Sequence, residues 1–199
     1  MNAVLDQWIN CWTKNGVVKK SPIDILRDKG DIIEPVGSAQ DIFSVIRFLT
    51  VLAVSSDWVD GDWESYLEQN SDCFELFEDK PFLQVESKEH ASPVGKLFSE
   101  IPACSSINFT SEIIPTKDGE YVVCTSCATY GMIRFNSFTP PGGEGYQSGI
   151  NNVPPYYCLR WENSLKEIIS LNLPKNTNSK DLPLWHRKFK ENNGEIGDL

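Results

Sequence analysis

A run of mostly apolar residues at positions 42–54 (IFSVIRFLTVLAV) places the strongest constraint on the fold. The run is too short to span a bilayer and contains Arg47, so we expect it in the core of the protein. Residues 38–41 (SAQD), directly before it, resemble a capping box. The sequence therefore predicts a central buried helix. The apolar side chains that recur at helical spacing are Ile42, Val45, Ile46, Leu49, Leu52 and Ala53.

Shorter segments of helical and extended character surround this helix. Residues 4–18 predict a hairpin with its turn at 14–16 (KNG). This irregular mixture indicates the α+β class, in a single domain that mixes short helices with small antiparallel strand pairs. We place that domain at residues 1–190 and a flexible tail at 191–199. Further helices are expected at 21–26, 63–67, 92–98, 124–135 and 165–171, and short strands at 107–109, 121–123 and 156–159.

The net charge of −10 argues against autonomous binding to nucleic acid, because a free acidic protein repels a phosphate backbone. Binding inside an assembly stays open, since partners can supply positive charge. Hydrophobic residues make up 40% of the chain, which is enough for a folded core. Residues 1–10 lack the basic and apolar regions of a signal peptide. We therefore expect a cytoplasmic protein with no membrane partner, whose 6 cysteines are reduced thiols.

Cys124 and Cys127 form a C-x-x-C pair at the start of an expected helix. Sulfur atoms at positions i and i+3 share one face, where two thiolates provide half of a tetrahedral zinc site. The pair is alternatively redox-active, with the first thiol acidified by the helix N-terminus, or simply two buried thiols. The chain has no second C-x-x-C, and Cys104 and Cys158 are the further candidate ligands. The sequence allows a structural zinc but requires no cofactor.

No set of residues predicts catalysis. The two histidines, His90 and His186, lie in polar segments away from the cysteine and serine motifs, which disfavours a nucleophile–histidine pair. Residues 138–149 (FTPPGGEGYQSG) match neither G-x-G-x-x-G nor the Walker A pattern. Their glycines suit a structural turn or a close approach of the backbone to a ligand. We expect a protein that is not an enzyme.

The order of several short segments is more informative than any one of them. This series resembles the N-terminal domain of the CasA family, the large subunit of the type I-E CRISPR surveillance complex Cascade. The resemblance covers about residues 4–186, and members of the family are considerably longer, so the chain corresponds to a short form. The segments are LDQWI at 5–9, KPFLQ at 80–84, SPVGKL at 92–97, ACSSINF at 103–109, C-x-x-C at 124–127, GGEGYQSG at 142–149, LNLP at 171–174 and LPLW at 182–185.

The resemblance implies a non-catalytic Cascade subunit that senses the protospacer-adjacent motif (PAM) of target double-stranded DNA in antiviral defence. A glycine loop of the family approaches the minor groove of the PAM duplex, where a backbone without Cβ atoms can enter. A second loop contacts the 5′ handle of the guide RNA and neighbouring subunits. The implied partners are guide RNA, target DNA, other Cascade subunits and a recruited helicase-nuclease. The implied DNA contacts are Gly142, Gly143, Gly145, Tyr146, Gln147 and Ser148, and the implied RNA and subunit contacts are Ser105, Ser106, Asn108 and Phe109.

Three features separate the chain from the family pattern, and the first is its net charge of −10, which requires support from the assembly. Glu144 stands between the loop glycines, where a carboxylate near phosphates opposes binding. The family's further PAM-reading lysine, its glutamine wedge and its C-terminal helical bundle lie beyond the matched region. Two alternatives therefore stay open: a structural cap of the complex without PAM reading, and a small zinc or redox protein built on the C-x-x-C pair.

Overall fold

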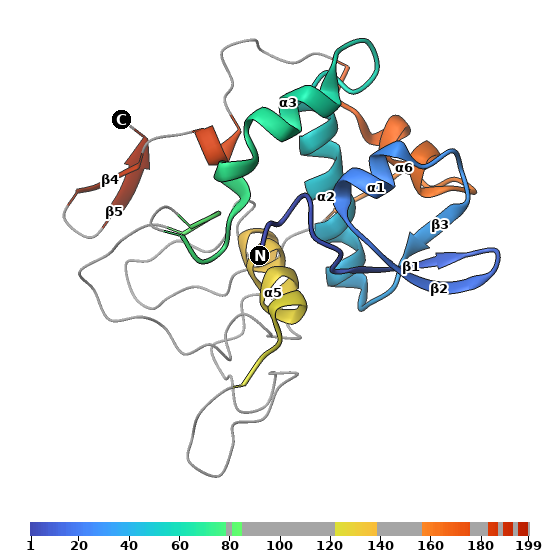
Figure 1. Cartoon of the computed structure of the whole chain (residues 1–199), viewed down its shortest axis with the longest axis horizontal. Helices are drawn as coiled ribbons and strands as arrows, with labels where there is room; N and C mark the ends of the chain where they lie inside the picture. Colours follow the sequence, from blue (N-terminus) through green and yellow to red (C-terminus); the bar gives the residue numbers. More distant parts are fainter. Residues whose placement is uncertain are drawn as a thin grey trace.

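A computed structural model describes residues 1–78, 81–84, 122–138, 157–175, 183–186, 189–192 and 195–198 (Figure 1). Within these ranges, helices and short antiparallel strands are mixed irregularly, which confirms the predicted α+β class. No helix of the described residues has the length and apolar character that a membrane crossing needs. The helices are α1 (Pro22–Arg27), α2 (Ala39–Ser55), α3 (Trp63–Gln69), α5 (Thr125–Phe138) and α6 (Leu165–Asn172), with 3-10 turns η1 (Ser71–Phe74) and η3 (Leu184–His186). The strands are β1 (Ile9–Thr13), β2 (Gly16–Lys20), β3 (Ile32–Pro35), β4 (Phe189–Asn192) and β5 (Glu195–Asp198).

Helix α2 is the central element, as the apolar run predicted, and Figure 1 shows it in the middle of the fold. Its start is a complete capping box, in which the Ser38 side chain accepts from the Asp41 N–H and the Asp41 carboxylate accepts from the Ser38 N–H. Such a cap contributes about 1 kcal/mol to helix stability. Helices α1, α5 and α6 and strand β3 all pack against α2. A helix that is apolar on most sides needs this cover.

The predicted hairpin is confirmed and forms part of a three-stranded antiparallel sheet in the order β2-β1-β3. Gly16 closes the hairpin turn with φ +114°, a region that favours glycine. Strand β3 was not predicted, because four residues ending in Pro35 carry little strand signal. Its extended form depends on pairing with β1, which shows a register shift between Trp12 and Thr13.

Trp8 joins the hairpin to two helices of the core. Its side chain is fully buried, and its indole N–H donates a 2.9 Å hydrogen bond to the carbonyl of Ala3. The Tyr130 ring of α5 meets it edge-on at 4.9 Å, and the Phe48 ring of α2 lies at 6.5 Å. The sheet, α2 and α5 are therefore fixed relative to one another around one indole ring.

Residues far along the chain also dock on this core. The Trp185 ring of η3 lies 5.3 Å from Phe74 and 6.4 Å from Phe82. The Tyr66 hydroxyl and His186 Nε2 are 3.0 Å apart, which ties η3 to α3. Beyond η3, strands β4 and β5 pair antiparallel. The proposed division of the chain after residue 190 stays a prediction.

Several predicted elements differ from the structure or lie outside the described residues. Val122, Val123 and residues 157–159 have no regular structure, so the strands expected there are wrong for these described residues. Helix α5 ends at Phe138 rather than at residue 135, because its last turn packs against α2 and is held by the hydrogen bond from Tyr157 to Ser137. The helix expected at 92–98 and the strand expected at 107–109 lie outside the described residues.

Candidate nucleic-acid interface

Helix α5 connects the two segments that carry the predicted contacts. One segment, residues 85–121, ends directly before Val122, and the other, residues 139–156, begins directly after Phe138. The structure describes the residues at which both segments join the fold. The predicted contact residues themselves lie outside the described residues: Ser105, Ser106, Asn108 and Phe109 in the first segment, and Gly142, Gly143, Gly145, Tyr146, Gln147 and Ser148 in the second.

The two ends of segment 139–156 are held together. The Tyr157 hydroxyl donates a 2.6 Å hydrogen bond to the main-chain carbonyl of Ser137. The rings of Phe138 and Tyr157 meet edge-on at 5.2 Å. Phe43 of α2 stacks on Tyr157 at 4.0 Å and meets Phe138 edge-on at 5.7 Å. Segment 139–156 therefore leaves and re-enters the fold at one aromatic cluster, Phe43–Phe138–Tyr157, on the surface of α2.

A cationic side chain lies beside this cluster. Arg47 Nη1 donates a 3.0 Å hydrogen bond to Ser137 Oγ, at the last turn of α5. A pocket of about 340 Å³ opens next to it, along the side of α2 that faces residues 157–159. Aromatic rings beside a guanidinium are a combination found where proteins contact nucleic acid. The pocket is lined by Phe43, Arg47, Thr50, Val51, Tyr157, Cys158, Leu159 and Asn172.

At its other end, α5 begins with the C-x-x-C pair. Cys124 occupies the capping position: its carbonyl accepts from the Ala128 N–H at 2.9 Å, and its sulfur accepts from the Cys127 N–H at 3.3 Å. The backbone N–H and the thiol of Cys127, both donating to Cys124, hold the pKa of Cys124 below its usual value. The same thiol hydrogen bond, aided by partial loss of solvent around the sulfur, raises the pKa of Cys127. Both side chains are exposed, so the prediction of buried structural thiols is wrong for this pair.

For the predicted zinc site, the described residues contain two of the four ligands, Cys124 and Cys127. No group of three or more His, Cys, Asp or Glu side chains in those residues is arranged to hold a metal ion. Cys158 lines the pocket at the opposite end of α5, a helix of 14 residues and hence roughly 20 Å long, so it does not join the pair. Cys104 lies outside the described residues. A zinc ion held by Cys124 and Cys127 would need its other ligands from outside the described residues.

The middle of α5 is anchored to α2. Arg134 is almost fully buried, and its Nη1 lies 3.3 Å from Asp41 Oδ1. Asp41 thus caps α2 and pairs with α5 at the same time. Sequence reasoning missed both this pair and the aromatic cluster, because side chains this far apart along the chain, 19 positions for Phe138 and Tyr157 and 93 for Asp41 and Arg134, leave no periodic signal. One sequence feature did point to this region: Arg47 is a positively charged residue inside the apolar run 42–54.

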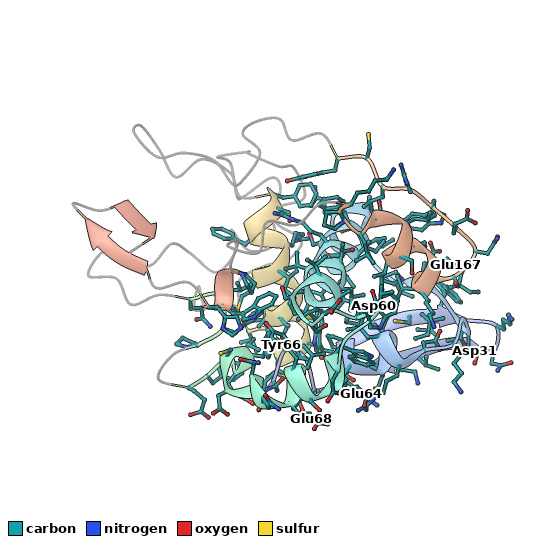
Figure 2. All side chains as sticks on the ribbon, turned by 90° about the horizontal axis from the view of Figure 1, so that it is seen from above. Asp31, Asp60, Glu64, Tyr66, Glu68 and Glu167 are labelled. Atoms are coloured by element: carbon teal, nitrogen blue, oxygen red, sulfur yellow. The ribbon has the colours of Figure 1, made fainter. Side chains whose placement is uncertain are left out.

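Negative charge is concentrated on another part of the surface. Residues 57–78 contain eight acidic residues and no basic residue, within a chain whose net charge is −10. Figure 2 shows Glu64 and Glu68 on α3, and Asp60 in the turn before it. In the described part of the chain, Arg27 pairs with Glu64 at 2.8 Å and the N-terminal amine with Glu75 at 3.2 Å. Two such pairs leave the segment strongly acidic, so a phosphate backbone is expected to avoid the α3 side of the protein.

Comparison with known proteins identifies a family and a fold. The sequence model of the family described as CRISPR-associated protein Cse1 matches residues 2–197. The fold is similar to that of CasA from Thermus thermophilus, with a TM-score of 0.70 and 21% identity, covering 93% of this chain and 41% of that one. It is also similar to Cse1 from Thermobifida fusca, with a TM-score of 0.69 and 17% identity, covering 94% and 42%.

A third similar fold belongs to a chain of a structure described as a CRISPR RNA-guided surveillance complex, pre-nicking. The TM-score is 0.67 and the identity 14%, covering 96% of this chain and 46% of that one. The chain thus spans less than half the length of these solved chains. The comparison with curated protein sequences gave no match.

Proposed function

Because the chain belongs to the Cse1 family of CRISPR-associated proteins, we propose that it acts as a non-catalytic subunit of a type I CRISPR surveillance complex (Cascade). In this proposal it senses the PAM of target double-stranded DNA through Gly142, Gly143 and Gly145. Residues Ser105, Ser106, Asn108 and Phe109 contact the 5′ handle of the guide RNA and neighbouring subunits. The guide RNA reads the target by base pairing, and a recruited helicase-nuclease cuts it.

The closed base of segment 139–156 is the observation that carries the proposal. Tyr157 and Ser137 hold the two ends together, and Phe43 attaches them to the central helix. A backbone that enters a minor groove only about 6 Å wide needs a fixed position relative to the rest of the protein. Anchoring both ends of a glycine-rich segment lowers the entropy lost when it binds, which favours a contact made by backbone atoms.

The distribution of charge also supports DNA binding at segment 139–156 rather than at the α3 side of the protein. Acidic residues gather in residues 57–78 on the α3 side, whereas Arg47 lies at the base of the glycine segment. Arg47 supplies positive charge at the base of this segment, where the proposal places the DNA. The overall charge of −10 still requires basic partners, which fits a protein that binds DNA only inside an assembly.

The test is reconstitution of the chain with guide RNA and the neighbouring CRISPR proteins, followed by titration with target DNA that carries or lacks the PAM. In the double variant Gly142→Ala/Gly143→Ala we expect assembly to be intact and PAM-dependent binding to fall at least about tenfold, because added Cβ atoms obstruct a close groove contact. Gly149→Ala is the matched control, since the resemblance places no DNA contact there. Unchanged PAM-dependent binding in the double variant would instead support a structural cap.

A further inference from the structure

The outer face of the β1–β2 hairpin carries exposed side chains that take no part in the hydrophobic core. Asn10 and Trp12 alternate with the buried positions of β1, and their cross-strand partners on β2 are Lys19 and Val17. All four side chains are exposed, Trp12 by 46% and Val17 by 49%. An indole ring flanked by an aliphatic side chain on an open sheet is a platform on which a planar group can stack.

The hairpin is also positively charged, although the protein as a whole is negatively charged. Residues 9–20 contain three lysines, Lys14, Lys19 and Lys20, and no acidic residue, in a chain of net charge −10. Among the cross-strand partners of Trp12, Glu34 of β3 is acidic and half-buried, on the side away from β2. Of the three lysines, Lys19 shares the outer face with Trp12, whereas Lys20 pairs with the buried Ile9. The β2 side of Trp12, where Lys19 lies, is therefore the side that suits an anion.

This face continues onto the start of α5. Lys19 Nζ lies 3.3 Å from Ser126 Oγ in the first turn of that helix. The N-terminus of a 14-residue helix adds partial positive charge at this point. Segment 85–121 contains the proposed RNA-contacting residues. It joins the described part of the chain at Val122, which is 79% exposed and lies just before α5 in the sequence.

We propose that the outer face of the β1–β2 hairpin is a further contact for the guide RNA, in which Trp12 stacks on an unpaired base and Lys19, with the first turn of α5, binds a backbone phosphate. Stacking on an indole requires a base whose face is free, which selects single-stranded over duplex nucleic acid. Diagonal neighbours on one face of a sheet, such as Trp12 and Lys19, lie roughly 7–8 Å apart, a separation that one nucleotide can bridge. This inference rests on the proposed function.

Guide-RNA affinity of the assembled complex, measured without target DNA, tests the stacking contact. We expect Trp12→Ala to weaken it roughly 5- to 150-fold, the range for loss of one base–aromatic stack, and Trp12→Phe to retain most of the affinity. Trp161→Ala is the matched control, because Trp161 is 50% exposed and lies outside this face. Thermal unfolding of each variant verifies the fold. Lys19→Gln is expected to reduce the log–log salt slope by about 0.7, the value for one phosphate on a single strand.

Photo-crosslinking of the DNA-free complex identifies the occupant. RNA crosslinked to the peptide 9–20 is the expected result. The inference would be overturned if the Trp12→Ala variant bound guide RNA as tightly as the parent protein. It would also be overturned if partner proteins alone, without RNA, protected residues 9–20 from hydrogen exchange. Neither result would affect the proposal of PAM sensing. A chain that does not enter the complex at all would overturn the proposed function as well.

Discussion

The hydroxyl of Tyr157 donates a 2.6 Å hydrogen bond to the carbonyl of Ser137, 20 positions earlier in the chain. This bond satisfies a carbonyl of the last turn of α5, and it closes the base of the glycine-rich segment 139–156. A structural bond and the geometry of the proposed DNA contact therefore depend on the same pair of residues.

Replacing Tyr157 with Phe removes this hydrogen bond and keeps the ring that stacks on Phe43. We expect the free energy of unfolding to fall by about 1 kcal/mol, and PAM-dependent target binding to weaken more than stability alone would explain. Denaturant unfolding and DNA titration of the assembled complex measure the two effects. Tyr157→Ala, which also loses the stacking on Phe43, is expected to be worse in both. Equal target affinity in the parent protein, Tyr157→Phe and Tyr157→Ala would show that the contacts at the base of segment 139–156 do not affect DNA binding.

Replacing Glu144 with Gln separates PAM sensing from a structural cap. If the segment approaches DNA, removal of this carboxylate lessens repulsion by up to about 1 kcal/mol, so target binding tightens up to roughly fivefold at low salt and less at high salt. A cap that never meets DNA predicts no change at any salt concentration. Glu68→Gln on the acidic α3 surface is a control of the same charge change.

The C-x-x-C thiols are expected to differ in reactivity. The pKa of Cys124 is lowered by donation from Cys127, so near neutral pH more of it is thiolate. Alkylation of the native protein, followed by mass spectrometry, should therefore label Cys124 before Cys127. Burial raises the pKa of Cys11 to about 12 and should protect it until the chain unfolds. Because the folded pKa of Cys124 is depressed, its stabilising contribution is present above its usual pKa and is lost as pH falls through the folded value. Labelling of Cys127 first would contradict this assignment.

Zinc content distinguishes a half-site from a complete one. Two thiolates alone bind zinc weakly compared with four ligands. We expect the purified chain to contain well under one zinc per molecule, and any bound metal to be lost in Cys124→Ser/Cys127→Ser. Elemental analysis of the chain alone and of the assembled complex measures this. Stoichiometric zinc in the chain alone would show that residues outside the described ranges complete the site.

The Asp41–Arg134 pair should show an asymmetric response to mutation. Arg134 is 2% exposed and Asp41 18% exposed, so Asp41→Asn removes the carboxylate that faces a buried guanidinium. We expect that change to cost about 1–3 kcal/mol of unfolding free energy, because it weakens both a charge-assisted contact and the capping box of α2. Arg134→Met should cost less, because the remaining carboxylate still accepts from the Ser38 N–H and is reached by water. Adding Arg134→Met to Asp41→Asn should recover part of the loss. A double-mutant cycle from urea unfolding measures the coupling.

Local chemistry was sufficient to predict several elements. Ser38 before the apolar run predicted the start of α2, and the KNG turn predicted the β1–β2 hairpin. The C-x-x-C pair was placed correctly at the start of a helix. These features depend on residues within a few positions of one another, so the pattern along the chain contains them.

The sequence by itself determined the central helix, the hairpin, the α+β class and the order of segments by which the family was identified. The tertiary structure decided strand β3, which is extended because it pairs with β1, and the length of α5, which is set by packing on α2. It also decided that Phe43, Phe138 and Tyr157 meet, and that Lys19 reaches Ser126. Such contacts join residues about 20 to more than 100 positions apart, and they exist because burying apolar surface brings distant parts of the chain together.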